Sequence, residues 1–226
     1  MNAEGPALPI AEAPAITAAP TPVATPPGAA ALAVRDPARA LAELRRAWRP
    51  HAQWWVFGYA SLIWRPEFEA AEHRPALLHG WHRALRMRSR VNRGTPEQPG
   101  LVFALLPGGA CRGMVYRLRP ETAERELERL WAREMPTGVY DPRLVPCHTG
   151  QGSVVALAFT LSRRSEACLP RLAEAELLRI LRQARGRYGT TLEYLAETAR
   201  ALVSHGVRDR EVERLVALAR RHGLLP

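Results

Sequence analysis

Glu134 holds the position in this chain that points most directly to chemistry. It follows Leu127, Leu130 and Trp131 at helical spacing, so a carboxylate stands where the pattern calls for an apolar side chain. A glutamate at a helix end ordinarily reaches into water. A carboxylate held among apolar groups instead has its pKa raised by desolvation, which suits a general acid or base near neutral pH. We therefore predict that Glu134 is a catalytic acid/base.

The stretch of residues 54–64, W-W-V-F-G-Y-A-S-L-I-W, is the second candidate for a functional element. It begins apolar and aromatic, as a buried strand does, and breaks at the small residues of positions 58–61. A turn of this kind can present backbone N–H groups to an anion or to a developing oxyanion. An ordinary strand end is the alternative interpretation.

Other catalytic or metal-binding arrangements have little support in the sequence. Ser61 does not lie in a G-x-S-x-G motif, and Cys147 and His148 are adjacent, which no standard Cys-His nucleophile uses. His79 and His82 are three apart on an expected strand and would face opposite sides. We therefore expect neither a metal site nor a bound cofactor.

The charge of the chain limits the possible mechanisms further. All 32 basic residues are arginine, and the formal net charge is +10. The absence of lysine excludes a Schiff-base mechanism and a P-loop lysine. A basic surface attracts anions, either nucleic acid or small anionic substrates. The nucleic-acid interpretation depends on arginine alone, because no aromatic platform of the RNP type accompanies it.

Cysteine content and hydropathy indicate the compartment. The three cysteines, Cys111, Cys147 and Cys168, are odd in number and form no C-x-x-C pair. This usage argues against a disulfide framework and favours a reducing compartment, so we expect a cytoplasmic protein. No apolar run approaches the ~18 residues of a membrane span, and we expect no membrane association.

Three parts are expected along the 226 residues. Residues 1–34 are rich in Ala and Pro and predict a disordered tail. Residues 35–50 predict a helical lead-in, with Asp36 as N-cap before Pro37. Residues 51–226 predict a single domain of ordinary size.

Within that domain the pattern predicts strands followed by helices. Strands are expected at residues 77–89, 101–106 and 112–118, the last two joined by a hairpin at Pro107-Gly108-Gly109. A helix should run from Pro120 to Pro136, followed by strands at 143–149 and 153–161. Further helices are expected at 170–187, from Thr190 onward with a capping box, and around 212–219. This order predicts a mixed α+β fold around a curved or closed sheet.

Several of these segments resemble the ChaC-type γ-glutamylcyclotransferases. Residues 57–64 are similar to that family's opening motif F-G-Y-G-S-L-I-W, with Ala60 in place of a glycine. Four more markers follow in the family's order: R-G-T-P at 93–96, G-x-x-Y-R-L at 113–118, R-E at 133–134, and T-L-E-Y-L at 191–195. The resemblance covers residues 54–199, and the segment 135–140 departs from the family's shorter K-x-G-Y.

The resemblance implies a fold and a set of roles. The fold would be the α+β γ-glutamylcyclotransferase-like mixed β-barrel with flanking helices and a helical C-terminal part. Glu134 would be the catalytic acid/base. The substrate-binding residues would be Phe57, Gly58, Tyr59, Ala60, Ser61, Leu62, Arg93 and Tyr140.

The resemblance also implies a reaction. Members of the family act on a γ-glutamyl amide, whose own α-amine attacks its γ-carbonyl and closes a ring, so that glutathione yields 5-oxoproline and Cys-Gly. We expect glutathione as the partner, no cofactor, no nucleic acid, no membrane, and a monomer. One alternative is the same fold acting on another γ-glutamyl amide, or inactive. Another, of a different class, is a basic nucleic-acid-binding module.

Overall fold

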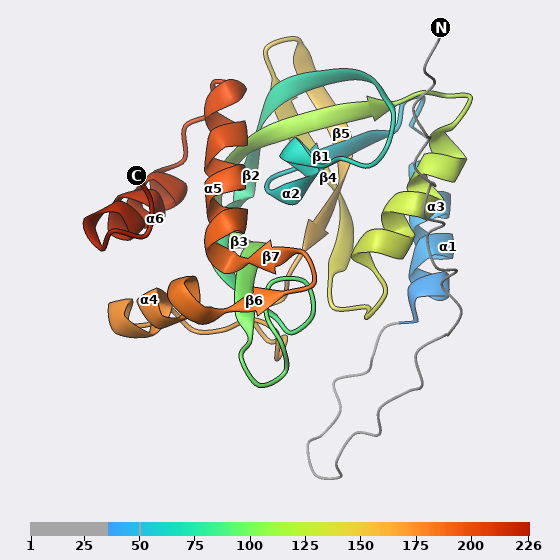
Figure 1. The fold of residues 1–226 in the computed structure, drawn as a ribbon. Helices are drawn as coiled ribbons and strands as arrows, with labels where there is room; N and C mark the ends of the chain where they lie inside the picture. The colour runs from blue at the N-terminus through green and yellow to red at the C-terminus, as the bar shows by residue number, and fades with distance from the viewer. Residues whose placement is uncertain (1–35, 50) are drawn as a thin grey trace, which may run out of the picture. The chain divides into compact units, whose positions relative to one another are not determined.

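A computed structural model of the chain describes residues 36–49 and 51–226 (Figure 1). The expected tail, residues 1–34, lies outside the described residues. The elements in chain order are α1 (Pro37–Trp48), β1 (Trp55–Gly58), α2 (Ser61–Trp64), β2 (Ala70–Ser89), β3 (Gly100–Leu118), α3 (Ala123–Glu134), β4 (Asp141–Thr149), β5 (Gly152–Thr160), α4 (Glu174–Gln183), β6 (Arg185–Gly186), β7 (Gly189–Thr190), α5 (Thr191–Ser204) and α6 (Arg210–Arg221).

Five strands close into a barrel in the order β1-β3-β2-β4-β5 (Figure 1). Every neighbouring pair is antiparallel except β1 and β5, which run parallel and bring Trp55 opposite Ala156. The closed barrel surrounds the main apolar core. Phe57, Phe103 and Phe159, from three different strands, are almost completely buried in it. The expected mixed α+β barrel is therefore confirmed.

The expected hairpin at residues 107–109 is wrong. β3 continues through Pro107, Gly108 and Gly109 as one strand and pairs along its whole length with β2. Both glycines have positive φ, +98° and +75°, and the pairing register shifts nearby, between His79 and Trp81 of β2. The glycines therefore bend a long two-stranded ribbon instead of reversing the chain.

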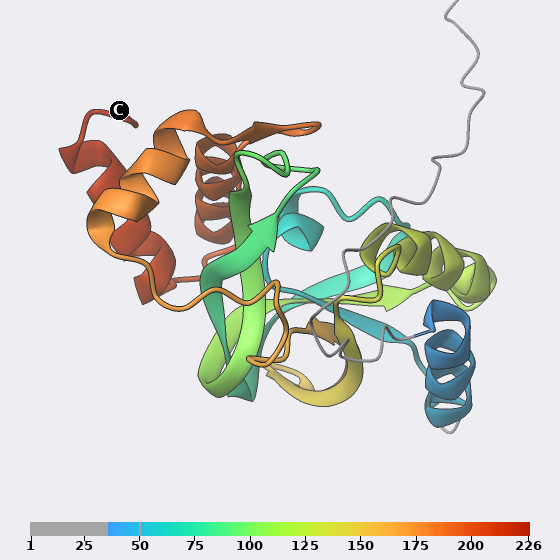
Figure 2. The same cartoon turned by 90° about the horizontal axis from the view of Figure 1, so that it is seen from below.

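The helical lead-in packs against α3 on one side of the barrel (Figure 2). The Asp36 side chain caps α1 by accepting a hydrogen bond from Ala38 N at 2.9 Å. Trp131 of α3 donates from its ring nitrogen to Pro37 O at 3.0 Å. Trp48 stacks on Trp54 with ring centroids 4.9 Å apart, so α1 is joined to both the helix and the start of β1.

Helices α4, α5 and α6 lie on the other side of the barrel (Figure 2). The expected capping box is present at the start of α5, where Thr190 and Glu193 exchange hydrogen bonds. The helix expected at 170–187 is shorter, because Gly186 and Gly189 form the tight two-residue strands β6 and β7. In the described part of the chain, no helix combines the length and the apolar character needed to cross a bilayer.

Candidate active site

A small pocket lies between the end of α3 and the loop that follows β1. We call residues 59–62 the catalytic loop, after the role that the sequence led us to expect of them. The pocket encloses about 20 Å³, room for roughly one water-sized group. It is lined by Tyr59, Ala60, Ser61, Leu62, Phe103, Glu134, Tyr140 and Phe159. Six of the residues predicted from the sequence therefore meet in one place, although Tyr59 and Tyr140 are 81 positions apart.

Glu134 is the last residue of α3 and points its carboxylate into this pocket. Only 14% of its side chain is exposed. Burial raises the pKa of Glu134 above its usual value, and the nearby Glu67 raises it further, while Arg133 opposes both. A carboxylate with a raised pKa can both accept and return a proton near neutral pH.

Tyr59 and Tyr140 line the pocket beside that carboxylate, and the charge of Glu134 also reaches Tyr194. Tyr59 donates from its hydroxyl to Phe159 O at 3.0 Å and is hydrogen-bonded to Tyr140. Burial raises the pKa of Tyr59, Tyr140 and Tyr194, and the charge of Glu134 adds to the increase in each of them. All three phenols therefore stay protonated at neutral pH.

Arg133 holds the end of α3 against the catalytic loop. Its Nε lies 3.0 Å from Glu134 Oε1, and its terminal nitrogens donate to Ser61 Oγ at 3.2 Å and to Arg65 O at 2.5 Å. A second ion pair joins it to Glu67 at 3.1 Å. One guanidinium thereby fixes the distance between the carboxylate and the loop. The R-E marker contained this residue, but the sequence assigned it no role.

This chain has alanine at position 60, where the family that it resembles has glycine. Ala60 has φ −148°, which lies outside the left-handed region, so the alanine carries no strain of that kind. Ala60 precedes α2, and the N–H groups of the first helical residues have no partner within a helix. Ser61 and Leu62 are the first two residues of α2, and both line the pocket.

Three predicted substrate residues do not line the pocket. Phe57 is completely buried in the barrel core, and Gly58 ends β1 against the ring of Tyr116. Arg93 lies on the far side of α2, where it donates to Tyr188 O at 2.5 Å and its guanidinium faces Trp64. Phe57 and Gly58 belong to the strand that leads into the catalytic loop, and Arg93 packs against α2.

Arg83 is a residue that the sequence pattern did not single out. It lies on β2, and its side chain is completely buried. It donates to Tyr59 O at 2.5 Å and to Arg112 O at 2.6 Å, and it forms an ion pair with Asp209. The carbonyl of the first catalytic-loop residue is therefore anchored from inside the barrel wall.

The structure brings together no metal-binding cluster among the described residues. His79 lies beside His148, with ring centroids 5.4 Å apart, and His82 Nδ1 lies 2.8 Å from Gly108 O. Cys111, Cys147 and Cys168 are all free thiols. Burial raises the pKa of Cys111 to about 11 and of Cys147 to about 12, so neither is a reactive thiolate at neutral pH.

Comparison with known proteins gives consistent relatives. A model of the ChaC-like protein family matches residues 54–222. The glutathione-specific gamma-glutamylcyclotransferase of Escherichia coli (strain K12) is 38% identical over 156 residues, covering 69% of this chain and 68% of that protein. The enzyme of the same name from Schizosaccharomyces pombe is 31% identical over 173 residues, covering 68% and 84%.

A solved structure has the same fold. The crystal structure of a γ-glutamyl cyclotransferase specific to glutathione from yeast aligns with a TM-score of 0.68 and 22% sequence identity, covering 75% of this chain and 96% of the other. At this identity the likeness concerns the fold.

Proposed function

The chain belongs to the family of ChaC-like proteins, and from that premise we propose that it is a γ-glutamylcyclotransferase that degrades glutathione to 5-oxoproline and Cys-Gly. The observation that carries this function is the buried Glu134 carboxylate facing the catalytic loop in one small pocket. Such a site has an acid/base, but its lining contains no cysteine, and no histidine that could activate the Ser61 hydroxyl as a nucleophile. It suits a reaction in which the substrate supplies the nucleophile itself.

In the first step Glu134 takes a proton from the substrate's α-ammonium group. The freed amine attacks the γ-carbonyl carbon, and a C–N bond forms as the five-membered ring closes. Attack within one bound molecule avoids bringing two reactants together, and good orientation can be worth about 7–11 kcal/mol. The raised pKa of Glu134 makes its carboxylate a stronger base than an exposed glutamate.

In the second step the tetrahedral intermediate collapses. Its oxyanion accepts hydrogen bonds from N–H groups of the catalytic loop, and the phenols of Tyr59 and Tyr140 lie in the same pocket wall. The C–N bond to cysteine then breaks. Two protons in total pass from the ring nitrogen to the leaving nitrogen, the first of them through Glu134, so Cys-Gly leaves with a free amino terminus. The scheme requires no group beyond the carboxylate, the loop and the substrate.

Substrate entry requires the pocket to widen. Its volume of about 20 Å³ cannot hold a γ-glutamyl group. Tyr140 belongs to the connection between α3 and β4, and this connection and the catalytic loop form the two sides of the pocket. We propose that these two sides separate when the substrate binds. Arg133, which contacts both Glu134 and Ser61, then keeps the carboxylate and the catalytic loop at a constant distance from each other.

The test is the identity of the products from glutathione and from glutathione acetylated on its α-amine. Mass spectrometry should find 5-oxoproline and Cys-Gly from the first substrate and no cleavage of the second. Acetylation delocalises the nitrogen lone pair into an amide, so the ring cannot close. Free glutamate as the first product, or comparable cleavage of the acetylated compound, would show hydrolysis and would refute the ring-closing mechanism.

A further inference from the structure

A second, larger hollow lies on the opposite side of β2 and β3 from α1 and α3. It is bounded by these two strands, by the segment before α4, and by α4 and α6, and its volume is about 820 Å³. None of its lining residues belongs to the pocket of Glu134. The volume lies within the range of about 300–1,000 Å³ that is typical of small-molecule sites. We call this hollow the arginine groove.

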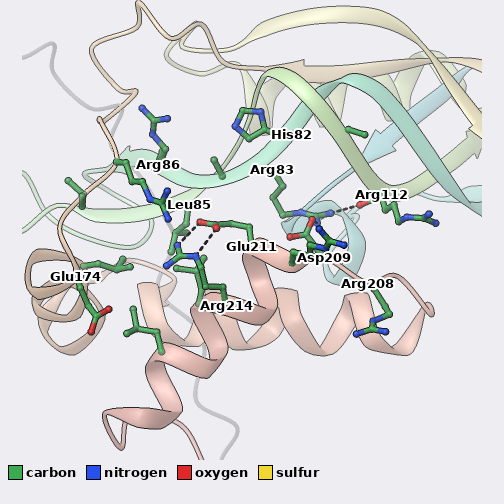
Figure 3. Close-up of a pocket in the computed structure, with 18 of the residues that line it drawn as sticks. His82, Arg83, Leu85, Arg86, Arg112, Glu174, Arg208, Asp209, Glu211 and Arg214 are labelled. Carbon is green, nitrogen blue, oxygen red and sulfur yellow. Dashed lines mark hydrogen bonds and ion pairs between the residues drawn. The ribbon is translucent and has the colours of Figure 1, made fainter.

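The walls of the arginine groove carry an excess of positive charge. Seven arginines line it, against three carboxylates. Two of those carboxylates are already paired within the groove, Asp209 with Arg83 and Glu211 with Arg214 at 2.8 Å (Figure 3). The third, Glu174, lies 3.4 Å from His222. Little negative charge is left to balance the remaining arginines.

The uncompensated cations come from three separate segments. Arg112 on β3, Arg171 before α4 and Arg210 at the start of α6 make no side-chain hydrogen bond or ion pair to any described residue, and all three are exposed. Arg86 on β2 is half-buried and is fixed by donating from Nε to Leu169 O at 2.7 Å. No terminal nitrogen of Arg86 has a partner within the described part of the chain.

This arrangement favours a ligand with phosphate groups. A hollow lined by one sign of charge focuses the field and concentrates counter-ions. Guanidinium groups match phosphate oxygens in a bidentate geometry, and a phosphate ester offers close to two charges per group. Six leucines, among them Leu172 and Leu215, line the same hollow and provide apolar surface beside the charges.

Nucleic acid fits the groove less well. The lining contains no Phe, Tyr or Trp side chain on which bases could stack. The groove is also a recess between a sheet and helices instead of a stripe along the surface (Figure 3). We propose that the arginine groove binds a small molecule that carries two or more phosphate groups. This site is separate from the γ-glutamyl site and does not depend on the function assigned there.

The test uses inorganic tripolyphosphate as the probe and equilibrium dialysis at roughly 0.15 M salt, where charges more than about 8 Å apart are largely screened. The groove variant is Arg112→Gln combined with Arg210→Gln. The matched control is Arg46→Gln combined with Arg49→Gln, which removes the same charge from exposed arginines at the end of α1. Thermal unfolding of each variant checks that both remain folded.

The parent protein should bind one tripolyphosphate per chain. The groove variant should weaken that binding at least about tenfold, because it loses two charge-assisted partners, and the control should change it less than twofold. Equal weakening in both variants, several weak sites, or no saturable binding would overturn the proposal. So would tighter binding of a single-stranded oligonucleotide that both variants weaken equally, since that result would indicate a diffuse nucleic-acid surface.

Discussion

Replacing Glu134 by glutamine should lower the activity of this enzyme without lowering its stability. The amide has nearly the same shape as the carboxylic acid but cannot take up a proton. Loss of a general acid/base typically lowers turnover by about 10²–10⁴, which corresponds to roughly 3–5 kcal/mol in the activation barrier. Most of the 5-oxoproline formation should therefore disappear.

The effect on stability follows from the direction of the pKa shift. Burial raises the pKa of Glu134, so the folded state holds this proton more tightly than the unfolded chain does. Stability is then lost as the pH rises from the unfolded value, about 4.3, through the raised folded value. Each unit of elevation corresponds to about 1.4 kcal/mol. Glutamine carries no charge, so the variant avoids the cost of burying a carboxylate. It also loses the ion pair with Arg133, but the raised pKa means that the cost of burying the charge exceeds the stabilisation from that ion pair.

The two effects need separate measurements. Turnover is followed as 5-oxoproline release at saturating glutathione, and thermal unfolding is recorded at several pH values from about 4 to 8, across the window given above. The melting temperature of Glu134→Gln, relative to the parent, should increase with pH and then level off. Glu126→Gln removes another buried carboxylate from the same helix, away from the pocket, and should keep its turnover.

Two results would refute this reasoning. A folded Glu134→Gln protein with turnover within tenfold of the parent would show that this carboxylate is not the acid/base. A variant whose melting temperature falls further below the parent as the pH rises would show that the ionised carboxylate stabilises the fold. In that case the pairing with Arg133 would outweigh burial.

Three further predictions concern the surroundings of the site. Arg133→Gln should move the acid limb of the pH profile of kcat/KM to higher pH, because it removes a charge that lowers the pKa of Glu134. Glu67→Gln should move the acid limb to lower pH, because it removes a charge that raises that pKa. Shifts of both variants in the same direction would contradict the assignment of Glu134. Gly113→Ala should destabilise the protein by roughly 1–3 kcal/mol, since its Cβ would overlap the carbonyl that precedes the catalytic loop, whereas Gly150→Ala, with open space around it, should be near neutral in denaturant unfolding. Ala60→Gly should cost about 0.5–1 kcal/mol through added chain entropy and gain no stability, because φ at this position is negative; a higher melting temperature would show hidden strain.

The carboxylate and the loop that we propose as the active site could be predicted from the sequence because both depend on local pattern. Glu134 interrupts a helical stripe, and the loop interrupts a buried strand, so each is visible within about ten residues. Phe103 and Phe159 complete the pocket wall from β3 and β5, and only barrel closure brings them there. No spacing within either strand distinguishes these two phenylalanines from ordinary core residues.

The hairpin expected at residues 107–109 is wrong and the burial of Arg83 was not predicted, and both failures come from contacts between segments far apart in the sequence. Gly108 and Gly109 are the residues that a tight turn uses, and they are also the residues that a bulged strand uses. The choice depends on the partner strand, and β2 is long enough to pair on both sides of the bend. The burial of Arg83 could not be read from the arginines near it in the sequence, because its ion-pair partner Asp209 lies 126 positions away.

The parallel pairing of β1 with β5 has a consequence for biosynthesis. β1 cannot complete its pairing until residues near Ala156 have left the ribosome, so the barrel closes only after about a hundred further residues have been made. Non-local pairing of this kind makes folding slow compared with local helix and hairpin formation. The catalytic loop depends on the same late event, since Tyr59 is held by Phe159 O and, through Arg83, by Asp209. The nascent chain should therefore pass through a long interval in which the catalytic loop has been synthesised but the enzyme is inactive. During that interval the unpaired edge of β1 is exposed to chaperones and to other chains.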